Sequence, residues 1–383
     1  MRKLCIDLPP LAPDYSGAAS ALFDMGGVVV MHDASGCTGN YTGFDEPRWL
    51  GSRSALYCSG MRSMDAIMGN DDKFIRRTLD AAESIKPSII AYLGSPVPMV
   101  IGTDLEGMAA ETEAESGIPS FGFNTTGECY YDKGASDVYM TLIKRFADIP
   151  EKKSDNKKRV NIIGLIPIDF GNKGNDKKIY DFVSSLGYEI TAKFAMGLDV
   201  EQVRACTKAD INIVVSRSGL DTAEYMKKKY NIPYICAVPL NDGSIFTSKL
   251  DGSFTDSRPE GKSRVIIIHE QVFANSLRDE LNKRGISADV GSMFGLDKRI
   301  SEKSDLDLPD ESTIRKLVNS GRYDVVIADP QIKQLIKNEK TNLVSVPHVA
   351  VSSKLHWNEY LDYLSGDIEN VIQKTIDYLK LDF

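Results

Sequence analysis

Short apolar runs recur along this chain, and most are followed by a polar loop and a segment with helical periodicity. A short apolar run bounded by turn residues is typical of a buried strand. Repeated strand–loop–helix alternation favours a parallel sheet, whose functional loops lie at the carboxyl ends of the strands. The runs are residues 26–31, 88–93, 160–164, 211–215, 264–268, 324–328 and 343–347.

The runs fall into three groups, which predicts three similar units. We expect a cluster-binding first domain, a second domain, a third domain and a helical C-terminal return segment at residues 1–150, 160–240, 262–347 and 348–383. Residues 151–159 are charged and lack apolar periodicity, and residues 241–262 are rich in Gly, Ser and Asp, so both are predicted linkers. The predicted fold class is α/β, with three Rossmann-like parallel-sheet domains and a C-terminal helix.

Charge and hydropathy narrow the classes of function. The formal net charge is −8, and no Lys/Arg block with interleaved aromatic residues occurs. Nucleic-acid binding is not expected, because basic side chains would have to neutralise the phosphates. No apolar stretch approaches the ~18 residues that span a bilayer, and the N-terminus leads to prolines rather than to a signal-peptide core. We expect a soluble, cytoplasmic protein without a membrane partner.

Several common motifs of catalysis are missing. The glycine-rich residues 171–177 lack the Walker spacing, so a polar connector is favoured over a phosphate loop. The chain has no GxSxG elbow and no HExxH, and its four histidines follow no zinc spacing. Its six cysteines are too few and too scattered for a disulfide framework. They are therefore free, buried or metal-bound.

Arg217 and Ser218 lie between a predicted strand and a predicted helix. Backbone amides and a guanidinium at a helix N-terminus suit a carboxylate or a phosphate. A helix cap with Arg217 in a surface ion pair explains the same residues equally well. Both interpretations stay open from the sequence.

Two cysteines lie in short glycine-containing loops, the first of which follows the apolar run 26–31. Cys37 stands between Gly36 and Gly39, and Cys58 precedes Gly60. Loops of this kind suit iron–sulfur ligation, because glycine leaves room for backbone amides to approach the sulfur atoms. Two thiolates cannot saturate a cubane cluster, but two chains could supply four. A buried cysteine without metal is the alternative.

The order of these features resembles nitrogenase component 1 and its superfamily, which includes the light-independent protochlorophyllide and chlorophyllide reductases, a coenzyme F430 reductive cyclase component and cofactor-assembly scaffolds. The resemblance rests on the two cysteine loops, the stretch 86–91, the stretch 100–107 and Arg217-Ser218 with residues 226–234. It implies a homodimer, or a heterodimer with a paralogous subunit, that holds a cluster between the first domains. It also implies an ATP-dependent iron–sulfur reductase as the electron donor.

The sequence departs from the family pattern at two positions. The third family cysteine should fall in residues 93–97, where this chain has Pro96, and the cofactor cysteine is replaced by Val215. A dinitrogen-reducing subunit is therefore not expected. Cys129 lies in a loop that approaches the cluster in the family, so it is a candidate third metal ligand, a nearby redox thiol or a thiol without metal. Cys206 and Cys236 are expected in the core.

The resemblance also draws attention to His348 and His356, because the corresponding family region carries histidines that line the substrate or cofactor cavity. Either is a candidate proton donor or axial ligand, since imidazole titrates near neutrality. A histidine that bonds to backbone in a loop is the structural alternative.

These observations predict a nitrogenase-like oxidoreductase component. Cys37 and Cys58 of two chains would hold a [4Fe–4S] cluster that passes low-potential electrons to an unidentified small-molecule substrate between the three domains. The alternative is a non-catalytic scaffold or carrier for metal-cluster or tetrapyrrole cofactor assembly. A third possibility is an α/β binding protein that has lost its cluster.

Overall fold

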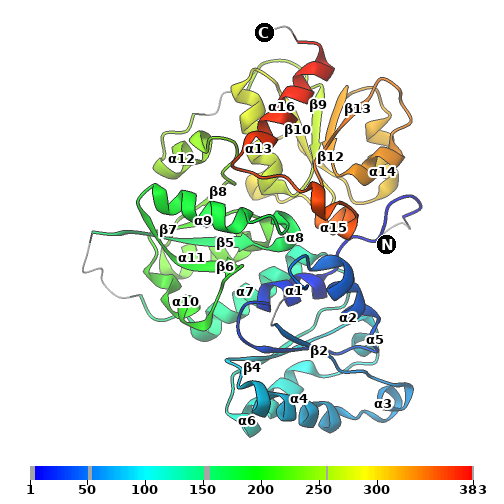
Figure 1. Cartoon of the computed structure of the whole chain (residues 1–383), viewed down its shortest axis with the longest axis vertical. Coiled ribbons are helices and arrows are strands. Elements are labelled where there is room, and N and C mark those ends of the chain that lie inside the picture. The colour runs from blue at the N-terminus through cyan, green and yellow to red at the C-terminus, as the bar shows by residue number, and fades with distance from the viewer. Residues whose placement is uncertain (1–4, 51–53, 151–155, 256–257, 382–383) are drawn as a thin grey trace.

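The structure, a computed structural model, describes residues 5–50, 54–150, 156–255 and 258–381. Within these ranges it contains three parallel sheets, with strand orders β2-β1-β3-β4, β6-β5-β7-β8 and β11-β10-β9-β12-β13. Helices cover the sheets, and the chain ends in α16 (Gly366–Leu379) (Figure 1). The predicted fold class is confirmed. The limits of the three domains stay predictions, and each sheet with its helices is called a unit below.

The first unit is the lower part of the molecule in Figure 1. Its strands are β1 (Val28–Met31), β2 (Ala55–Cys58), β3 (Ile90–Leu93) and β4 (Ser120–Phe123). Its helices are α1 (Asp14–Leu22), α2 (Gly36–Asn40), a π-helical turn (Tyr41–Asp45), α3 (Ser63–Met68), α4 (Asp71–Ile85), α5 (Pro96–Val100), α6 (Leu105–Ser116) and α7 (Tyr131–Phe146). The strands are short and apolar, as the first runs predict.

The second unit contains the longest strands. They are β5 (Lys158–Leu165), β6 (Tyr188–Ala195), β7 (Ile211–Val214) and β8 (Tyr234–Cys236). The helices are α8 (Pro167–Phe170), α9 (Asn175–Ser185), α10 (Val200–Ala205), a 3₁₀ turn (Cys206–Lys208), a 3₁₀ turn (Arg217–Gly219), α11 (Leu220–Tyr230) and α12 (Ser244–Asp251).

Both predicted linkers need correction. In the first, residues 151–155 lie outside the described residues, but Lys158 and Arg159 already belong to β5, where they pair with β6. In the second, α12 forms because Phe246 and Leu250, one helical turn apart, are buried. The ring of Phe246 packs 6.0 Å from that of Phe182. Two buried apolar side chains one turn apart thus accompany a helix in a segment that is otherwise polar.

The third unit forms the upper right of Figure 1. Its strands are β9 (Val265–Ile268), β10 (Ala288–Ser292), β11 (Leu306–Asp307), β12 (Val325–Ala328) and β13 (Asn342–Ser345). Its helical segments are α13 (Gln271–Lys283), a 3₁₀ turn (Lys298–Ile300), α14 (Glu311–Val318), a 3₁₀ segment (Pro330–Leu335), α15 (Val349–Ser352), a 3₁₀ segment (Ser353–Glu359) and α16.

Buried apolar side chains of all three units form one continuous cluster, and a second, smaller cluster lies between the first sheet and helices α4 and α6. The shared cluster fixes the units against one another. Within the described ranges, no helix combines the length and apolar character that crossing a bilayer requires.

Helices α1 and α7 pack with their backbones in close approach. A Cβ atom on Gly17 would lie 1.8 Å from the carbonyl oxygen of Tyr131, and one on Gly134 would lie 1.8 Å from that of Asp14. Only glycine fits these two positions without a shift of backbone. This packing matters for function, because α1 and α7 each begin at residues that border the candidate sites described below.

We predict that Gly17→Ala lowers the free energy of unfolding by about 2 kcal/mol or more, because the added methyl group overpacks a backbone contact. Gly366→Ala is the matched control, since no atom lies within 4 Å of a Cβ at that position. Urea denaturation of the two variants measures the difference. Equal stability of Gly17→Ala and Gly366→Ala would contradict the close packing.

Candidate functional site

The carboxyl ends of three neighbouring strands meet at one edge of the first sheet. Met31, the last residue of β1, pairs with Cys58 of β2 and with Leu93 of β3. Backbone bonds continue the alignment beyond the strands: Ser59 N–H donates to Met31 O over 3.0 Å, and His32 N–H donates to Leu93 O over 2.8 Å. The loops that follow the three strands therefore lie side by side.

Cys37 is in the first turn of α2, in the loop after β1, and is half-buried. The loop is fixed by Asp33, whose carboxylate accepts hydrogen bonds from the backbone N–H of Thr38 over 3.0 Å and from its hydroxyl over 3.2 Å. Gly36 and Gly39 leave open space, since no atom lies within 4 Å of a Cβ at either position. The two glycines therefore add no crowding to this loop, and cluster ligation by Cys37 stays a prediction.

Cys58 ends β2 and is also half-buried. Its Sγ donates to the carbonyl oxygen of Asp33 over 3.4 Å and accepts from the N–H of Gly60 over 3.3 Å. Asp33 thus touches both cysteine loops. Burial raises the pKa of the Cys37 thiol, nearby Asp33 and Cys58 raise it further, and hydrogen bonds with Tyr15 and Ser95 oppose the rise. Two thiolates side by side would need a cation to offset their charge.

The donor set of one chain is incomplete for a cubane cluster. Among the described residues, no group of three or more His, Cys, Asp or Glu side chains converges to hold a metal. Cys37 and Cys58 therefore fit one half of a four-thiolate site, and a second chain would have to supply the other half.

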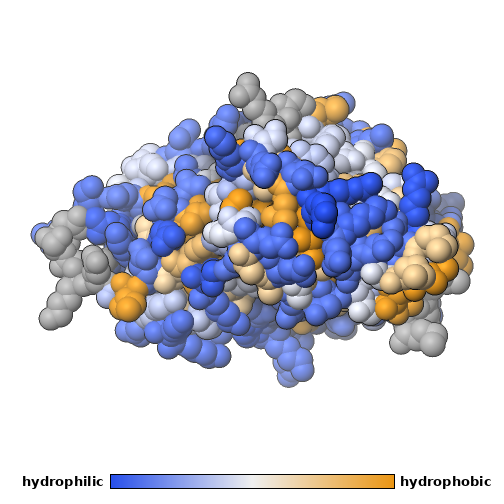
Figure 2. Space-filling view, turned by 90° about the horizontal axis from the view of Figure 1, so that it is seen from below, coloured by the Kyte–Doolittle hydropathy of each residue, from blue (hydrophilic) through white to orange (hydrophobic). Residues whose placement is uncertain are grey.

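Exposed apolar side chains surround the cysteine loops. An open groove of about 590 Å³ lies beside them, with Ser35, Gly60 and Val97 in its wall. Figure 2, which views the first unit from below, shows apolar side chains at its right-hand edge, the side of α3 in Figure 1. The large exposed apolar residues of this region are Leu50, Met64, Ile67, Met68, Val97, Val100 and Ile101. A contiguous apolar rim of this kind is typical of an interface with another protein.

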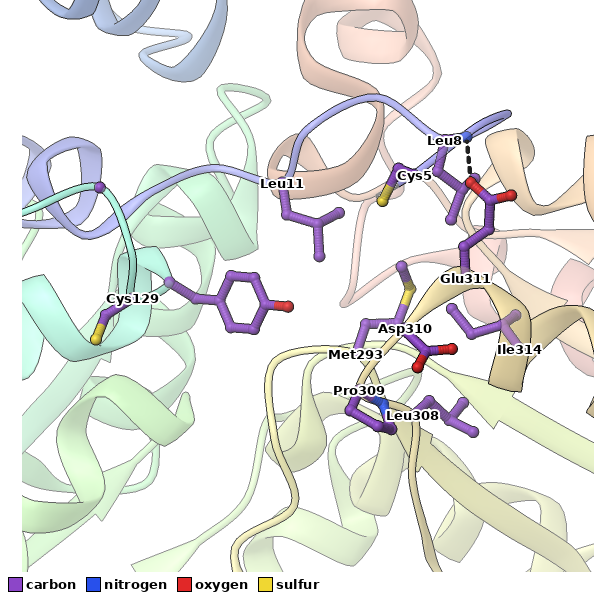
Figure 3. Close-up of a pocket in the computed structure, with 12 residues that line it drawn as sticks. Cys5, Leu8, Leu11, Cys129, Met293, Leu308, Pro309, Asp310, Glu311 and Ile314 are labelled. Carbon is purple, nitrogen blue, oxygen red and sulfur yellow. Dashed lines mark hydrogen bonds between the residues drawn. The ribbon is translucent and has the colours of Figure 1, made fainter. Parts of the chain in front are cut away.

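Cys129 lies in the loop before α7 and is exposed. With Cys5 it lines a cavity of about 180 Å³ between this loop, the N-terminal segment and the third unit. Figure 3 shows the Cys129 sulfur directed away from that cavity, whereas Cys5 faces into it. Ligation by Cys129 stays a prediction. Cys206 is fully buried, as expected of a core residue, but Cys236 is only partly buried.

A second polar group lies deep inside, where the three units meet. Asp169 of α8 accepts hydrogen bonds from the Tyr131 hydroxyl at the start of α7 and from His348 Nε2, the latter over 3.0 Å. His348 Nδ1 accepts from Ala350 N–H over 3.1 Å, so its hydrogen is on Nε2. The hydroxyl of Tyr363 donates to the Asp169 carbonyl oxygen over 2.9 Å. Asp169 therefore joins residues of all three units.

Arg217 is a second residue whose hydrogen bonds join different units. Its guanidinium pairs with Asp132 of α7 and donates to the carbonyl oxygen of Gly295 over 2.9 Å. Its backbone N–H donates to Glu270 over 2.8 Å, and the neighbouring Ser218 hydroxyl pairs with that of Ser216 over 2.9 Å. The structure thus engages the polar atoms of Arg217 and Ser218 with groups of the same chain. Cofactor binding by these two residues stays a prediction.

Aromatic rings pack around Asp169 and Arg217. The ring of Phe294 lies 5.1 Å from that of His348 and 5.2 Å from that of Tyr131. Val215, which stands where the family's cofactor cysteine is expected, is fully buried. Position 215 therefore offers no thiol, and the rings of Phe294, Tyr131 and His348 pack against one another beside Asp169.

The two histidines singled out from the sequence lie in different surroundings. Burial lowers the pKa of His348 to about 3, so it is neutral at physiological pH. His356 lies outside the junction, with Nδ1 bonded to Glu359 over 2.9 Å. Proton donation by either stays a prediction. Sequence reasoning missed Tyr131, Asp169 and Glu270, although Asp169 and Glu270 each follow a predicted strand within a few residues.

Comparison with known proteins gives the following matches. A sequence model of the nitrogenase component 1 type oxidoreductases matches residues 13–242. One component of the light-independent protochlorophyllide reductase of Crocosphaera subtropica is 29% identical over 103 residues, which are 27% of this chain and 20% of that protein. The nitrogenase molybdenum-iron protein alpha chain of Clostridium pasteurianum is 27% identical over 235 residues, 59% of this chain and 42% of that protein. The chain thus spans less than half of these two relatives.

Two further matches extend over most of the chain. The nitrogenase iron-molybdenum cofactor biosynthesis protein NifE of Clostridium pasteurianum is 23% identical over 360 residues, 89% of this chain and 74% of that protein. The solved structure "Nitrogenase Cp1 at pH 5" superposes with a TM-score of 0.70 at 17% identity, covering 99% of this chain and 90% of that chain. The structural match shows a shared fold.

We predict that the free energy of unfolding falls as pH rises from about 4 to 7, by up to about 1.4 kcal/mol per pH unit for each buried carboxyl that titrates. Burial raises the pKa of Asp169 to about 7, and burial with nearby Asp169 raises that of Glu270. The folded chain thus binds protons that the unfolded chain has released. Asp169→Asn keeps an acceptor for Tyr131 and His348 but no longer titrates. It should therefore reduce the change of the free energy of unfolding with pH. Urea denaturation across this pH range measures it, and an unchanged slope in Asp169→Asn would contradict the assignment.

Proposed function

The chain belongs to the nitrogenase component 1 type oxidoreductases, and from this premise we propose that it is a nitrogenase-like component that holds one [4Fe–4S] cluster between two chains. Cys37 and Cys58 of each chain would be its ligands. An ATP-dependent iron–sulfur reductase would be the electron donor, and a small molecule the acceptor.

The observation that carries the proposal is the pair of half-buried thiols in the loops at adjacent strand ends, where Asp33 accepts from Thr38 N–H beside Cys37 and from the Cys58 thiol. A cubane cluster takes four cysteine ligands, and one chain brings two to this edge. The exposed apolar rim around the loops supports a second chain as the source of the others. Whether that chain is a second copy or a paralogue is left to the experiment.

A bound [4Fe–4S] cluster supplies one-electron transfer at low potential. The residues of this chain supply its surroundings: Gly60 N–H donates to the Cys58 sulfur, and open space lies where Gly36 and Gly39 would carry side chains. Burial of the apolar rim of α3 and α5 in the complex would exclude water from the thiolates. The hydrogen bond to sulfur would favour the reduced state, and limited solvent access would oppose it, so the two together would set the potential.

The proposal includes no role in dinitrogen reduction. The interdomain junction does not fit a second metal cofactor, because Val215 offers no thiolate and the rings of Tyr131, Phe294 and His348 occupy the space. Arg217 and His348 are engaged there with other groups of the chain. The sequence suggested a substrate between the three units. We instead propose that the substrate binds outside this junction.

An assembly scaffold is the second candidate function. It is favoured by one observation, the match to a cofactor biosynthesis protein over 89% of this chain. Mixing the anaerobically purified protein with a reductase partner, ATP and dithionite separates the two candidates. Repeated oxidation of the reduced cluster by a product-forming acceptor supports the oxidoreductase, whereas transfer of the metal cluster to an acceptor protein without turnover supports the scaffold.

We predict that the anaerobically purified protein contains four iron and four sulfide per two chains, and that Cys37→Ala and Cys58→Ala each reduce the iron content at least tenfold. Loss of one thiolate per chain removes two of four ligands. Cys5→Ala is the matched control, because Cys5 is an exposed thiol of another surface. Iron and sulfide analysis with electron paramagnetic resonance (EPR) measures the result.

Cys129→Ala completes this series. With two ligands from each chain, we expect the variant to keep the full iron content and the EPR spectrum of the wild type. Loss of the cluster in Cys129→Ala would instead assign Cys129 as a third ligand. A full cluster in Cys37→Ala would reject the ligand assignment altogether.

A further inference from the structure

A cavity of about 220 Å³ lies between the first sheet and α4, at the edge of the sheet that β2 forms. From the sheet, it is lined by Val28 and Val30 of β1 and by Tyr57 of β2. Val30 pairs with Tyr57 in the register of the two strands. Because residues two positions apart on a strand point the same way, these three side chains share one face of the sheet.

The helix side of the cavity consists of residues at helical spacing. Phe74, Arg77, Thr78 and Ala81 of α4 line it, and side chains three or four positions apart lie on one face of a helix. Phe74 and Thr78 are buried, and the Thr78 hydroxyl donates to the Phe74 carbonyl oxygen over 2.9 Å. Sheet and helix thus give the cavity an apolar floor.

Two polar groups border this floor without a partner. Arg77 is exposed, and Tyr57 is 43% exposed. Among the described residues, no hydrogen bond or ion pair engages the Arg77 guanidinium or the Tyr57 hydroxyl. Ser59 and Cys58 also border the cavity, but both side chains donate to the carbonyl oxygen of Asp33, over 3.2 and 3.4 Å. Of the described residues that line the cavity, none is acidic.

We propose that this cavity binds a small carboxylate with an apolar body. The guanidinium of Arg77 would pair with the carboxylate, because its parallel N–H donors match the two oxygens, and the Tyr57 hydroxyl would donate to the same group. The hydrocarbon part would lie on Val28, Val30 and Phe74. A cavity of about 150 Å³ holds one benzene ring, so this volume suits one ring with a short acid arm. The site uses neither cysteine thiol and does not depend on a bound metal.

Isothermal titration calorimetry with 3-phenylpropionate tests the assignment, and the neutral 3-phenylpropanol is the comparison ligand. We expect the acid to bind about tenfold more tightly than the alcohol, because hydrogen bonds between charged groups are stronger than neutral ones. Arg77→Gln should remove this preference. Arg76→Gln is the matched control, since Arg76 is also exposed but lies outside the cavity wall. We expect it to keep the wild-type preference.

Ala81→Leu tests the apolar floor, because the larger side chain fills part of the cavity without a change of charge. The affinity for both ligands should fall. The inference is overturned if the wild type does not bind the acid, if it binds acid and alcohol equally, if Arg77→Gln keeps the preference or if Ala81→Leu keeps the affinity. If Ala81→Leu does not fold, the two arginine variants still decide, since both positions are exposed. A failure here leaves the cluster proposal standing, because iron content is measured separately.

Discussion

The parallel register of β1 with both β2 and β3 is the constraint on which the candidate metal site depends. Met31 pairs with Cys58 on one side and with Leu93 on the other, so three loops leave the sheet at one level. Asp33 then bonds to the loops of both cysteines, and Ser95 reaches back to His32. A shift of one residue in this register would turn Cys58 to the other face of the sheet.

The interdomain junction and the cysteine edge of the first sheet differ in whether their polar groups find partners within one chain. At the interdomain junction, Asp169 and Arg217 bond to residues of all three units, and rings fill the remaining space. At the edge of the first sheet, two thiols remain half-buried beneath an exposed apolar rim. The junction joins the three units within one chain, whereas we propose that another chain completes the cysteine edge. The proposed function therefore places the metal centre at the cysteine edge and not at the junction.

Much of this arrangement could be predicted from the sequence, because local patterns determine it. The apolar runs predicted β1, β3, β5, β7, β9, β12 and β13 of the three parallel sheets, and Cys37 and Cys58 were paired from their glycine-containing loops and the family resemblance. The junction could not be predicted: Tyr131 and His348 are 217 positions apart, and no local pattern shows that they share Asp169. Helix α12 was missed because its apolar stripe is only two residues long.

The central claim is that one chain carries half of a metal site and that a second chain completes it. Native mass spectrometry of the anaerobically purified protein tests this most directly. The account predicts that the added mass of four iron and four sulfur atoms is found only on species that contain two chains, and that a single 42.3-kDa chain carries none of it. A single chain that carries the complete cluster would contradict the account.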